Sequence, residues 1–310
     1  MRIVFMGTPE FAVPCLERLL QDGHEVAGVF TQPDKPKGRG YAMAAPPVKQ
    51  AAQRAALPVF QPISVKTEET LAQLRELAPE LIVVVAYGKI LPRAVLELPE
   101  YGCINVHASL LPRLRGAAPI QWAILRGDQK SGVTTMYMDT GLDTGDMLLK
   151  AETPIGADET AGELHDRLSQ MGAQLLSDTL HALQRGSLRR EPQREEDSTY
   201  APMLDKSLCP IDWSKTAQEI HNQIRGLSPW PVAVTRLRGR QLKVHTSRLE
   251  EQSGVGPAGA VVVGKDCIRV VCGDGRLLSL VCVQPEGGKR MAAADFLRGH
   301  PIQEGTILGE

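Results

Sequence analysis

RIVFMGTPEFAVPCLERLLQDGHEVAGVFT, residues 2–31, decides the fold class of this chain. RIVFM (2–6) has the continuous apolar character of a buried strand, and EVAGVFT (25–31) is a second run of the same kind. Between them, PEFAVPCLERLLQDG has apolar residues at helical spacing and ends on Gly23, as helices often do. Strand, helix and strand in this order predict a βαβ unit, in which the two strands are parallel.

The alternation of helices and strands continues beyond this unit. Helices are predicted at 48–56, 67–77, 92–98, 116–126 and 160–185, and strands at 58–60, 81–87, 103–107 and 133–138. This order is typical of a parallel sheet covered by helices, so we expect a Rossmann-like α/β domain over residues 1–187. QPDKPKGRGYAMAAPP (32–47) interrupts the pattern with prolines, glycines and basic residues, and predicts a mobile surface loop.

The last third of the chain has a different character. GSLRREPQREEDSTYAP (186–202) is polar and highly charged, which predicts a linker over residues 188–204. Short β-rich runs separated by glycine turns follow, namely VAVTRL, QLKVHTSRL, GAVVVG, CIRVVC and LLSLVCVQ. They are typical of a small barrel, so we expect an OB-like β-barrel domain over residues 205–310.

The composition is that of a soluble globular protein, and we expect the chain to stay in the cytoplasm. Hydrophobic residues make up 43% and charged residues 23%. The first apolar stretch is too short for a secretion signal, and LIVVVAY (81–87) is far below the ~20 residues of a membrane span. Residues 205–310 carry 14 basic against 11 acidic side chains, whereas 1–204 carry 21 against 25. This asymmetry is a weak indication of a nucleic-acid partner.

The first turn of the predicted sheet lacks the glycines that bind common cofactors. MGTPEF (6–11) does not supply G-x-G-x-x-G, and G-x-x-x-x-G-K-[ST] occurs nowhere in the sequence, which argues against a nicotinamide enzyme or an NTPase. The six cysteines form no C-x-x-C pair, and none of the seven histidines has the spacing of a metal site. We therefore expect no metal.

GCINVHASLLPRLRGAAP (102–119) places polar residues where a buried strand ends. Asn105 and His107 are two residues apart, so they face the same side, at the carboxyl end where ligands bind to open parallel sheets. MYMDTGLDTGD (136–146) follows another strand, and its Asp143 can reach the same edge. Structural roles are an open alternative, because strand-end histidines often hydrogen bond to a carbonyl and turn aspartates to local amides.

An amide, an imidazole and a carboxylate without a G-x-S-x-G elbow favour direct acyl transfer over a covalent acyl-enzyme. In such a reaction Asn105 donates a hydrogen bond to the oxygen that becomes negative. His107 donates to that oxygen or relays protons, and Asp143 orients the imidazole.

NVHASLLPRLRGAAPIQ (105–121) and GLDTGDML (141–148) closely resemble the formyltransferase family that uses 10-formyltetrahydrofolate. FMGTPEFAVP, TQPDKPKGRG, PVKQAA, VVVAYGKILP, IDW and PWP extend the resemblance over nearly the whole chain, to the branch that formylates the methionine on initiator tRNA. The resemblance implies that the formyl group of 10-formyltetrahydrofolate passes to the α-amino group of initiator methionyl-tRNA, with no metal.

The resemblance also implies roles for individual residues. The catalytic trio is Asn105, His107 and Asp143, and the folate-binding residues are Ser109, Leu110, Leu111, Pro112, Tyr87, Gly88, Ile90 and Leu91. The tRNA-binding residues are Lys37 and Arg39 in the 32–47 loop and Arg236, Arg238, Arg240 and Lys243 near the carboxyl end, all of which can contact phosphates.

Two alternative functions stay open. The first is a formyltransferase with the same trio and a small amine acceptor, such as an amino-sugar nucleotide or glycinamide ribonucleotide. The basic loop and the basic barrel argue against it, because a small acceptor needs neither. The second is a non-catalytic folate or RNA binder, which the intact trio disfavours. Nothing in the sequence requires an oligomer, and we expect a monomer.

Overall fold

The computed structural model describes residues 1–37, 42–264 and 267–310, and they form two compact units. The first unit comprises residues 1–117, 131–153 and 165–201, and the second comprises 118–130, 154–164 and 202–310. Both units are therefore discontinuous in sequence. Within the described ranges, no helix combines the length and the apolar character needed to cross a membrane.

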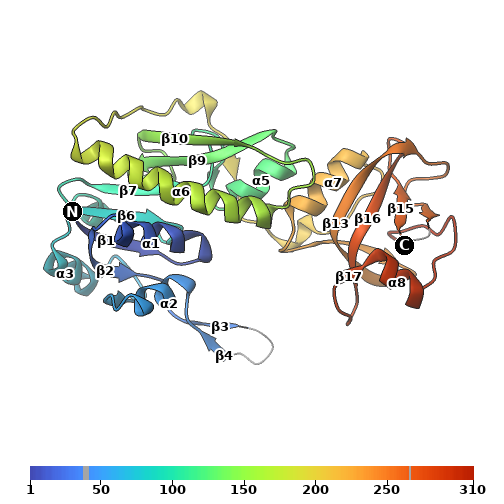
Figure 1. Ribbon diagram of the computed structural model, residues 1–310, viewed down its shortest axis with the longest axis horizontal. Coiled ribbons are helices and arrows are strands. Elements are labelled where there is room, and N and C mark those ends of the chain that lie inside the picture. The colour runs from blue at the N-terminus through green and yellow to red at the C-terminus, as the bar shows by residue number, and fades with distance from the viewer. Residues whose placement is uncertain (38–41, 265–266) are drawn as a thin grey trace. The chain divides into compact units, whose positions relative to one another are not determined.

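The first unit is a sheet with helices on both faces (Figure 1). Its elements are β1 (Arg2–Gly7), the 3-10 helix η1 (Glu10–Ala12), α1 (Val13–Gln21), β2 (Glu25–Phe30), β3 (Lys35–Lys37), β4 (Ala42–Ala44), α2 (Pro47–Arg54), β5 (Val59–Phe60), α3 (Glu68–Leu77), β6 (Leu81–Val85), α4 (Arg93–Leu96), β7 (Cys103–His107), β8 (Arg115–Gly116), β9 (Lys130–Tyr137), β10 (Met147–Pro154), most of α6 (Ala161–Gln184), η2 (Glu195–Asp197) and β11 (Tyr200–Ala201).

The strand order of the main sheet is β10-β9-β7-β6-β1-β2-β5. The pairs from β7 to β5 are all parallel, which confirms the Rossmann-like prediction, whereas β9 is antiparallel to β7. This pairing places Met136 opposite Asn105 and Thr134 opposite His107. The end of β9 therefore lies beside the start of β7, where the Met138 amide donates to the Cys103 carbonyl at 2.8 Å. The loop that follows extends back along β7, so that Asp143 lies near His107.

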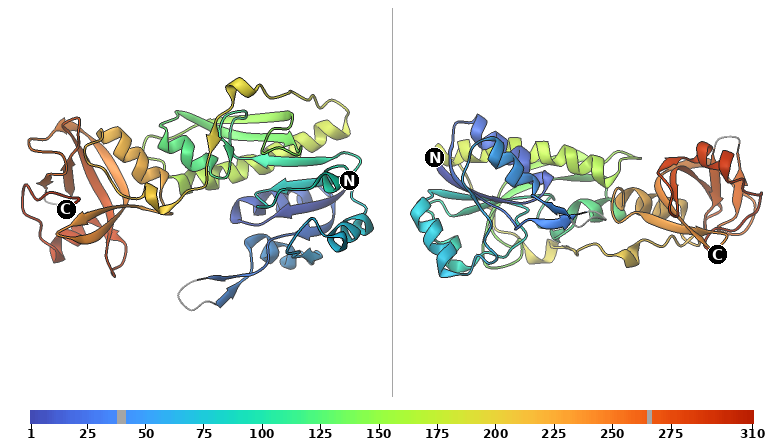
Figure 2. Two further views of the ribbon diagram at one scale, coloured as in Figure 1. Left: turned by 180° about the vertical axis from the view of Figure 1, so that it is seen from behind. Right: turned by 90° about the horizontal axis from the view of Figure 1, so that it is seen from below.

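The two faces of this sheet are covered by different helices (Figure 2). Val4 and Ile82 pack with Leu74 of α3 in one buried cluster, and α1 and α6 lie on the other face. In α6, a Cβ added at Gly172 would lie 3.1 Å from the Val106 side chain, so this glycine lets the helix approach β7 closely. Because side chains alternate along β7, Asn105 and His107 point away from α6.

Two segments of the first unit are more regular than the sequence predicts. Residues 32–47 contain an antiparallel hairpin of β3 and β4, because the backbones of 35–37 and 42–44 pair despite Pro36. The prediction of an irregular loop is wrong for these six residues, since strands this short show no periodicity. Part of 188–204 is also paired, because Glu191 bridges Met147 and β11 is parallel to β8.

The second unit is an antiparallel sheet domain. Its elements are α5 (Pro119–Leu125), the start of α6, η3 (Lys206–Leu208), α7 (Ala217–Gly226), β12 (Ala233–Leu237), β13 (Arg240–Ser253), β14 (Val261–Val263), β15 (Ile268–Val271), β16 (Arg276–Pro285), β17 (Met291–Ala292) and α8 (Ala293–Gly299). The strand order is β12-β13-β16-β15-β14, and β17 pairs with β16. Register shifts along β13 bend it, in keeping with the predicted OB-like fold.

A capping box of Thr216 and Glu219 starts α7, which packs Ile220 and Ile224 into the core of the second unit. α5 packs against α7 in the same unit, which explains why residues 118–130 group with the carboxyl-terminal part of the chain.

Candidate active site

Asn105 is the third residue of β7 and His107 is its last, and both residues are buried, with exposed fractions of 8% and 6%. Among the described residues, none hydrogen bonds to the side-chain amide of Asn105. A buried amide normally has a partner, so this one is available to a bound molecule.

The two ring nitrogens of His107 have different neighbours. Nε2 lies 3.0 Å from the carbonyl oxygen of Leu114, a residue with a left-handed backbone (φ +58°). Since a carbonyl only accepts, Nε2 carries the hydrogen of this bond. Nδ1 lies 3.7 Å from Oδ2 of Asp143, which is the distance of an ion pair and too long for a hydrogen bond. Nδ1 is therefore the nitrogen left for proton transfer.

Asp143 differs from the other two aspartates of the 138–146 loop. Its Oδ2 accepts a hydrogen bond from the Gly116 amide at 2.9 Å, and its backbone is left-handed (φ +54°). Asp139 accepts from Gly141 and Thr144 within the loop, and Asp146 pairs with Arg190 at 2.9 Å. Local turn bonding thus accounts for Asp139, and an ion pair accounts for Asp146, whereas Asp143 faces His107.

The turn at residues 109–112 is held by hydrogen bonds within it and to the neighbouring strand β9. The Ser109 hydroxyl donates to the Arg113 carbonyl at 2.6 Å, and Thr134 of β9 bonds to both the Ser109 carbonyl and the Leu111 amide. Leu111 is buried against two methionines, while Leu110 and Pro112 are partly exposed. The sequence did not indicate Thr134, which holds the turn from a neighbouring strand.

The segment 87–91 follows β6, the neighbour of β7. Tyr87 and Leu91 are buried in the core, and burial raises the pKa of the Tyr87 phenol to about 12. The Tyr87 carbonyl accepts hydrogen bonds from Thr8 and Gln32, both at 3.1 Å. Ile90 is 70% exposed. Of the residues predicted here, Ile90 and the turn at Gly88 (φ +79°) therefore offer an exposed surface.

Four of the residues predicted to bind tRNA lie on one hairpin of the second unit. Arg236, Arg238 and Arg240 are exposed, and Lys243 is half-buried. Arg238 and Gly239 form the turn, and both have positive φ (+51° and +74°), as two-residue hairpin turns require.

The other two residues predicted to bind tRNA belong to the first unit. The backbone of Lys37 pairs with Ala42 in the β3–β4 hairpin. Arg39 lies outside the described residues.

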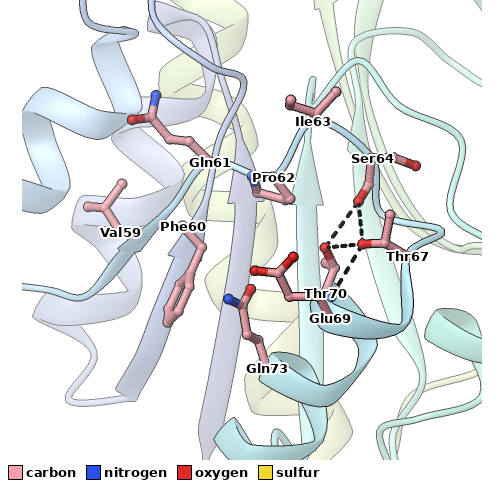
Figure 3. Close-up of a pocket in the computed structure, with 10 residues that line it drawn as sticks. All are labelled: Val59, Phe60, Gln61, Pro62, Ile63, Ser64, Thr67, Glu69, Thr70 and Gln73. Atoms are coloured by element: carbon pink, nitrogen blue, oxygen red, sulfur yellow. Dashed lines mark hydrogen bonds between the residues drawn. The ribbon is translucent and has the colours of Figure 1, made fainter.

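A cavity of about 550 Å³ lies elsewhere in the first unit, between the end of β5 and the start of α3 (Figure 3). Its polar groups are largely used locally, because Thr67 and Thr70 hydrogen bond to each other at 2.9 Å and to the Ser64 carbonyl. Lys89 donates to the Pro62 and Ile63 carbonyls on its rim. The trio, and not this cavity, is the candidate active site.

No group of three or more potential metal ligands occurs in the part of the chain that the structure describes. The trio instead consists of two strand-end side chains and one loop carboxylate, a set of groups whose chemistry includes hydrogen-bond donation and proton transfer.

Family models and curated relatives that match this chain all belong to the formyltransferases. A formyl transferase model matches residues 1–180, and a model of the formyl transferase C-terminal domain matches 203–301. The methionyl-tRNA formyltransferase of Alkaliphilus oremlandii is 53% identical over 311 residues, covering 100% of both chains. That of Citrifermentans bemidjiense is 54% identical over 311 residues, covering 100% of this chain and 97% of the relative.

Solved structures with a similar fold are more distant in sequence. An N-formyltransferase from Helicobacter canadensis, in complex with folinic acid and dTDP-3-aminofucose, has a TM-score of 0.69 at 21% identity, covering 90% of this chain and 98% of that one. HypX from Aquifex aeolicus, in complex with tetrahydrofolic acid, has a TM-score of 0.67 at 16% identity, covering 98% of this chain and 48% of that one.

Proposed function

This chain belongs to the methionyl-tRNA formyltransferase family, and from that premise we propose that it transfers the formyl group of 10-formyltetrahydrofolate to the α-amino group of methionine on initiator tRNA. The observation that carries the proposal is the meeting of Asn105, His107 and Asp143 at the carboxyl end of β7 in a chain of this family.

The trio accounts for each step of a direct transfer. The neutral amine attacks the formyl carbon, a C–N bond forms, and the formyl oxygen becomes negative. The free amide of Asn105 donates a hydrogen bond to that oxygen. His107 Nδ1, beside Asp143, takes the proton that the amine loses and delivers it to the folate nitrogen as its bond to the formyl carbon breaks. The products are the formylated aminoacyl-tRNA and tetrahydrofolate.

The observed turns fit a folate. Residues 86–91 and 108–114 follow β6 and β7, which are adjacent and parallel, so both turns lie at one edge of the sheet. Ile90 and Leu110 offer apolar surface there, and the backbone of both turns offers hydrogen-bonding groups for a flat heterocycle. Residues 109–112 and 87–91 would hold the donor, with Tyr87, Leu91 and Leu111 supporting it from the core.

In this proposal the two units have separate tasks. The first unit carries the chemistry, and the hairpin with Arg236, Arg238, Arg240 and Lys243 contacts tRNA phosphates, together with Lys37 and Arg39. A substrate used in translation places the protein in the cytoplasm, and we propose that it acts as a monomer.

A small amine acceptor is the second candidate, because the fold is shared with an enzyme solved with an amino-sugar nucleotide. That likeness is at 21% identity, against 53% for the relatives named after methionyl-tRNA. The deciding experiment offers the protein 10-formyltetrahydrofolate with either charged initiator tRNA or dTDP-3-aminofucose. We expect formyl-methionine and no formylated sugar, and the opposite pattern would overturn the proposal.

A further inference from the structure

Residues 191–201, which we call the strap, contact the segments that hold Asp143 and His107. We call these two residues the pair. Glu191 bridges Met147, while Tyr200 and Ala201 pair with β8. The strap belongs to the first compact unit, and its partners are distant in sequence.

Gln193 is the residue of the strap that touches the Asp143 loop. Its Nε2 donates to the carbonyls of Asp143 and Gly145, both at 2.8 Å. Its Oε1 accepts from Nε of Arg115 at 3.0 Å. Arg115 is itself buried, with 7% of its surface exposed, and its guanidinium also pairs with Glu195 at 2.7 Å.

These partners fix the orientation of the Gln193 amide. Two carbonyls require the NH₂ group on one side, and a guanidinium requires the oxygen on the other, so a flipped amide would lose all three bonds. Asp143 has a left-handed backbone, which costs free energy for a residue other than glycine unless its surroundings hold it. The bonds from Gln193 to residues 143 and 145 supply such a hold.

The strap also supports the other side of the pair. The Leu114 amide donates a hydrogen bond to the Thr199 hydroxyl at 2.9 Å, and the Arg115 amide donates one to the Thr199 carbonyl at 2.9 Å. The Leu114 carbonyl is the partner of His107 Nε2. One short segment therefore contacts both the loop that carries Asp143 and the residue that holds His107.

We propose that Gln193 is a positioning residue, which holds the 143–145 backbone where the Asp143 carboxylate reaches His107. This inference rests on the proposed formyl transfer. Because Gln193 bonds to main-chain atoms of the loop and not to the predicted folate turns, its loss is expected to lower kcat and leave both KM values nearly unchanged.

The test uses the full chain with three variants of the strap, and with Asp143→Asn as a second background. Gln193→Glu has the same shape and keeps the acceptor for Arg115, but it cannot donate to the two carbonyls. Gln193→Ala removes all three bonds. Glu195→Gln is the matched control, because it weakens the ion pair between Glu195 and Arg115 in the same strap. The Glu195 side chain is 80% exposed. Thermal melting checks that each variant folds.

We expect Gln193→Glu and Gln193→Ala to lower kcat about 10-fold to 100-fold, because small misplacements of catalytic groups have effects of this size. Both KM values should stay within about twofold, and Glu195→Gln should match the wild type. In an Asp143→Asn background, Gln193→Ala should lower kcat little further, because both changes act on the same group.

The outcomes separate the two proposals. If the wild type fails to formylate methionyl-tRNA, the proposed function is wrong. If the wild type is active and Asp143→Asn is impaired, but Gln193→Glu keeps wild-type kcat, only the role of Gln193 is wrong. A reduction of kcat by Gln193→Ala that is equally large with and without Asp143 also overturns the inference, since it indicates a general structural effect.

Discussion

The two ring nitrogens of His107 have different proposed roles: Nε2 is held by the Leu114 carbonyl, and Nδ1, beside Asp143, transfers the proton. Replacing His107 or Asn105 with alanine is expected to lower kcat by about 10² to 10⁴, because each change removes a group that acts on the developing charge or the moving proton. Folate binding, measured by fluorescence titration, should persist in both variants. Turnover equal to the wild type would contradict the assigned roles.

Gly145 is a second residue on which the site depends. A Cβ added there would lie 1.9 Å from the Tyr137 carbonyl oxygen, so Gly145→Ala has to displace the loop that carries Asp143. We expect a lower melting temperature and a kcat reduced at least 10-fold. Gly299→Ala is the control, because open space surrounds that position. A Gly145→Ala enzyme as active and as stable as the Gly299→Ala control would refute the prediction.

Individual residues also show where sequence reasoning stops. Asn105 and His107 lie in the last residues of a predicted strand, and Asp143 lies in the loop after another, so their positions can be read from the periodicity of the chain. Gln193 sits among charged residues with no pattern, and its three partners lie far from it in sequence. A contact of that kind is fixed only when the chain has folded.

At the scale of elements, the predictable parts are those with continuous burial. All five residues of β7 are buried, and the predicted range 103–107 matches it. β10 was not predicted, because its burial alternates irregularly and it lies at the edge of the sheet. The prediction of a parallel sheet is wrong for β9, which is antiparallel to β7, since apolar periodicity carries no information about strand direction.

Helix α7 carries a buried histidine whose charge affects stability. His221 is 1% exposed, and its ring nitrogens contact the Ser247 hydroxyl and the Ala157 carbonyl. Burial lowers its pKa below the usual value of about 6.5, against the smaller opposing effect of the Ala157 carbonyl. The neutral ring is therefore the form that the folded second unit accommodates.

The pH dependence follows from this direction. Below about pH 6.5 the unfolded chain takes up a proton at this position that the folded chain does not, so stability falls as the pH falls toward the lowered pKa. We expect urea unfolding to show a smaller loss of stability between pH 7.5 and 5.5 in His221→Gln than in the wild type. His24 and His245 also have lowered pKa values, mainly through burial, and both remain in the variant. An equal loss in both proteins would disprove the assignment.

At the scale of the whole molecule, the proposed substrate predicts a dependence on salt. Neutralising Arg238 and Arg240 together should raise the KM for charged tRNA. The slope of log KM against log salt concentration should also fall, by on the order of one unit for each phosphate that the variant no longer binds. The KM for the folate should stay unchanged. Arg185→Ala, at an exposed position of the first unit, is the control. A variant with the salt dependence of the wild type would argue against phosphate binding by this hairpin.

The division of the chain into two discontinuous units has a consequence for its synthesis. A ribosome releases residues 118–130 and 154–164 long before residues 202–310, with which they pack. During synthesis these two segments therefore lack their packing partners until the end of the chain is made. One of them is α5, whose side chains Ile120 and Ile124 are apolar. A break after residue 201 would leave both segments on the amino-terminal fragment, apart from residues 202–310 with which they pack. The two parts of this enzyme therefore cannot be separated, or exchanged with those of a relative, by one cut in the chain.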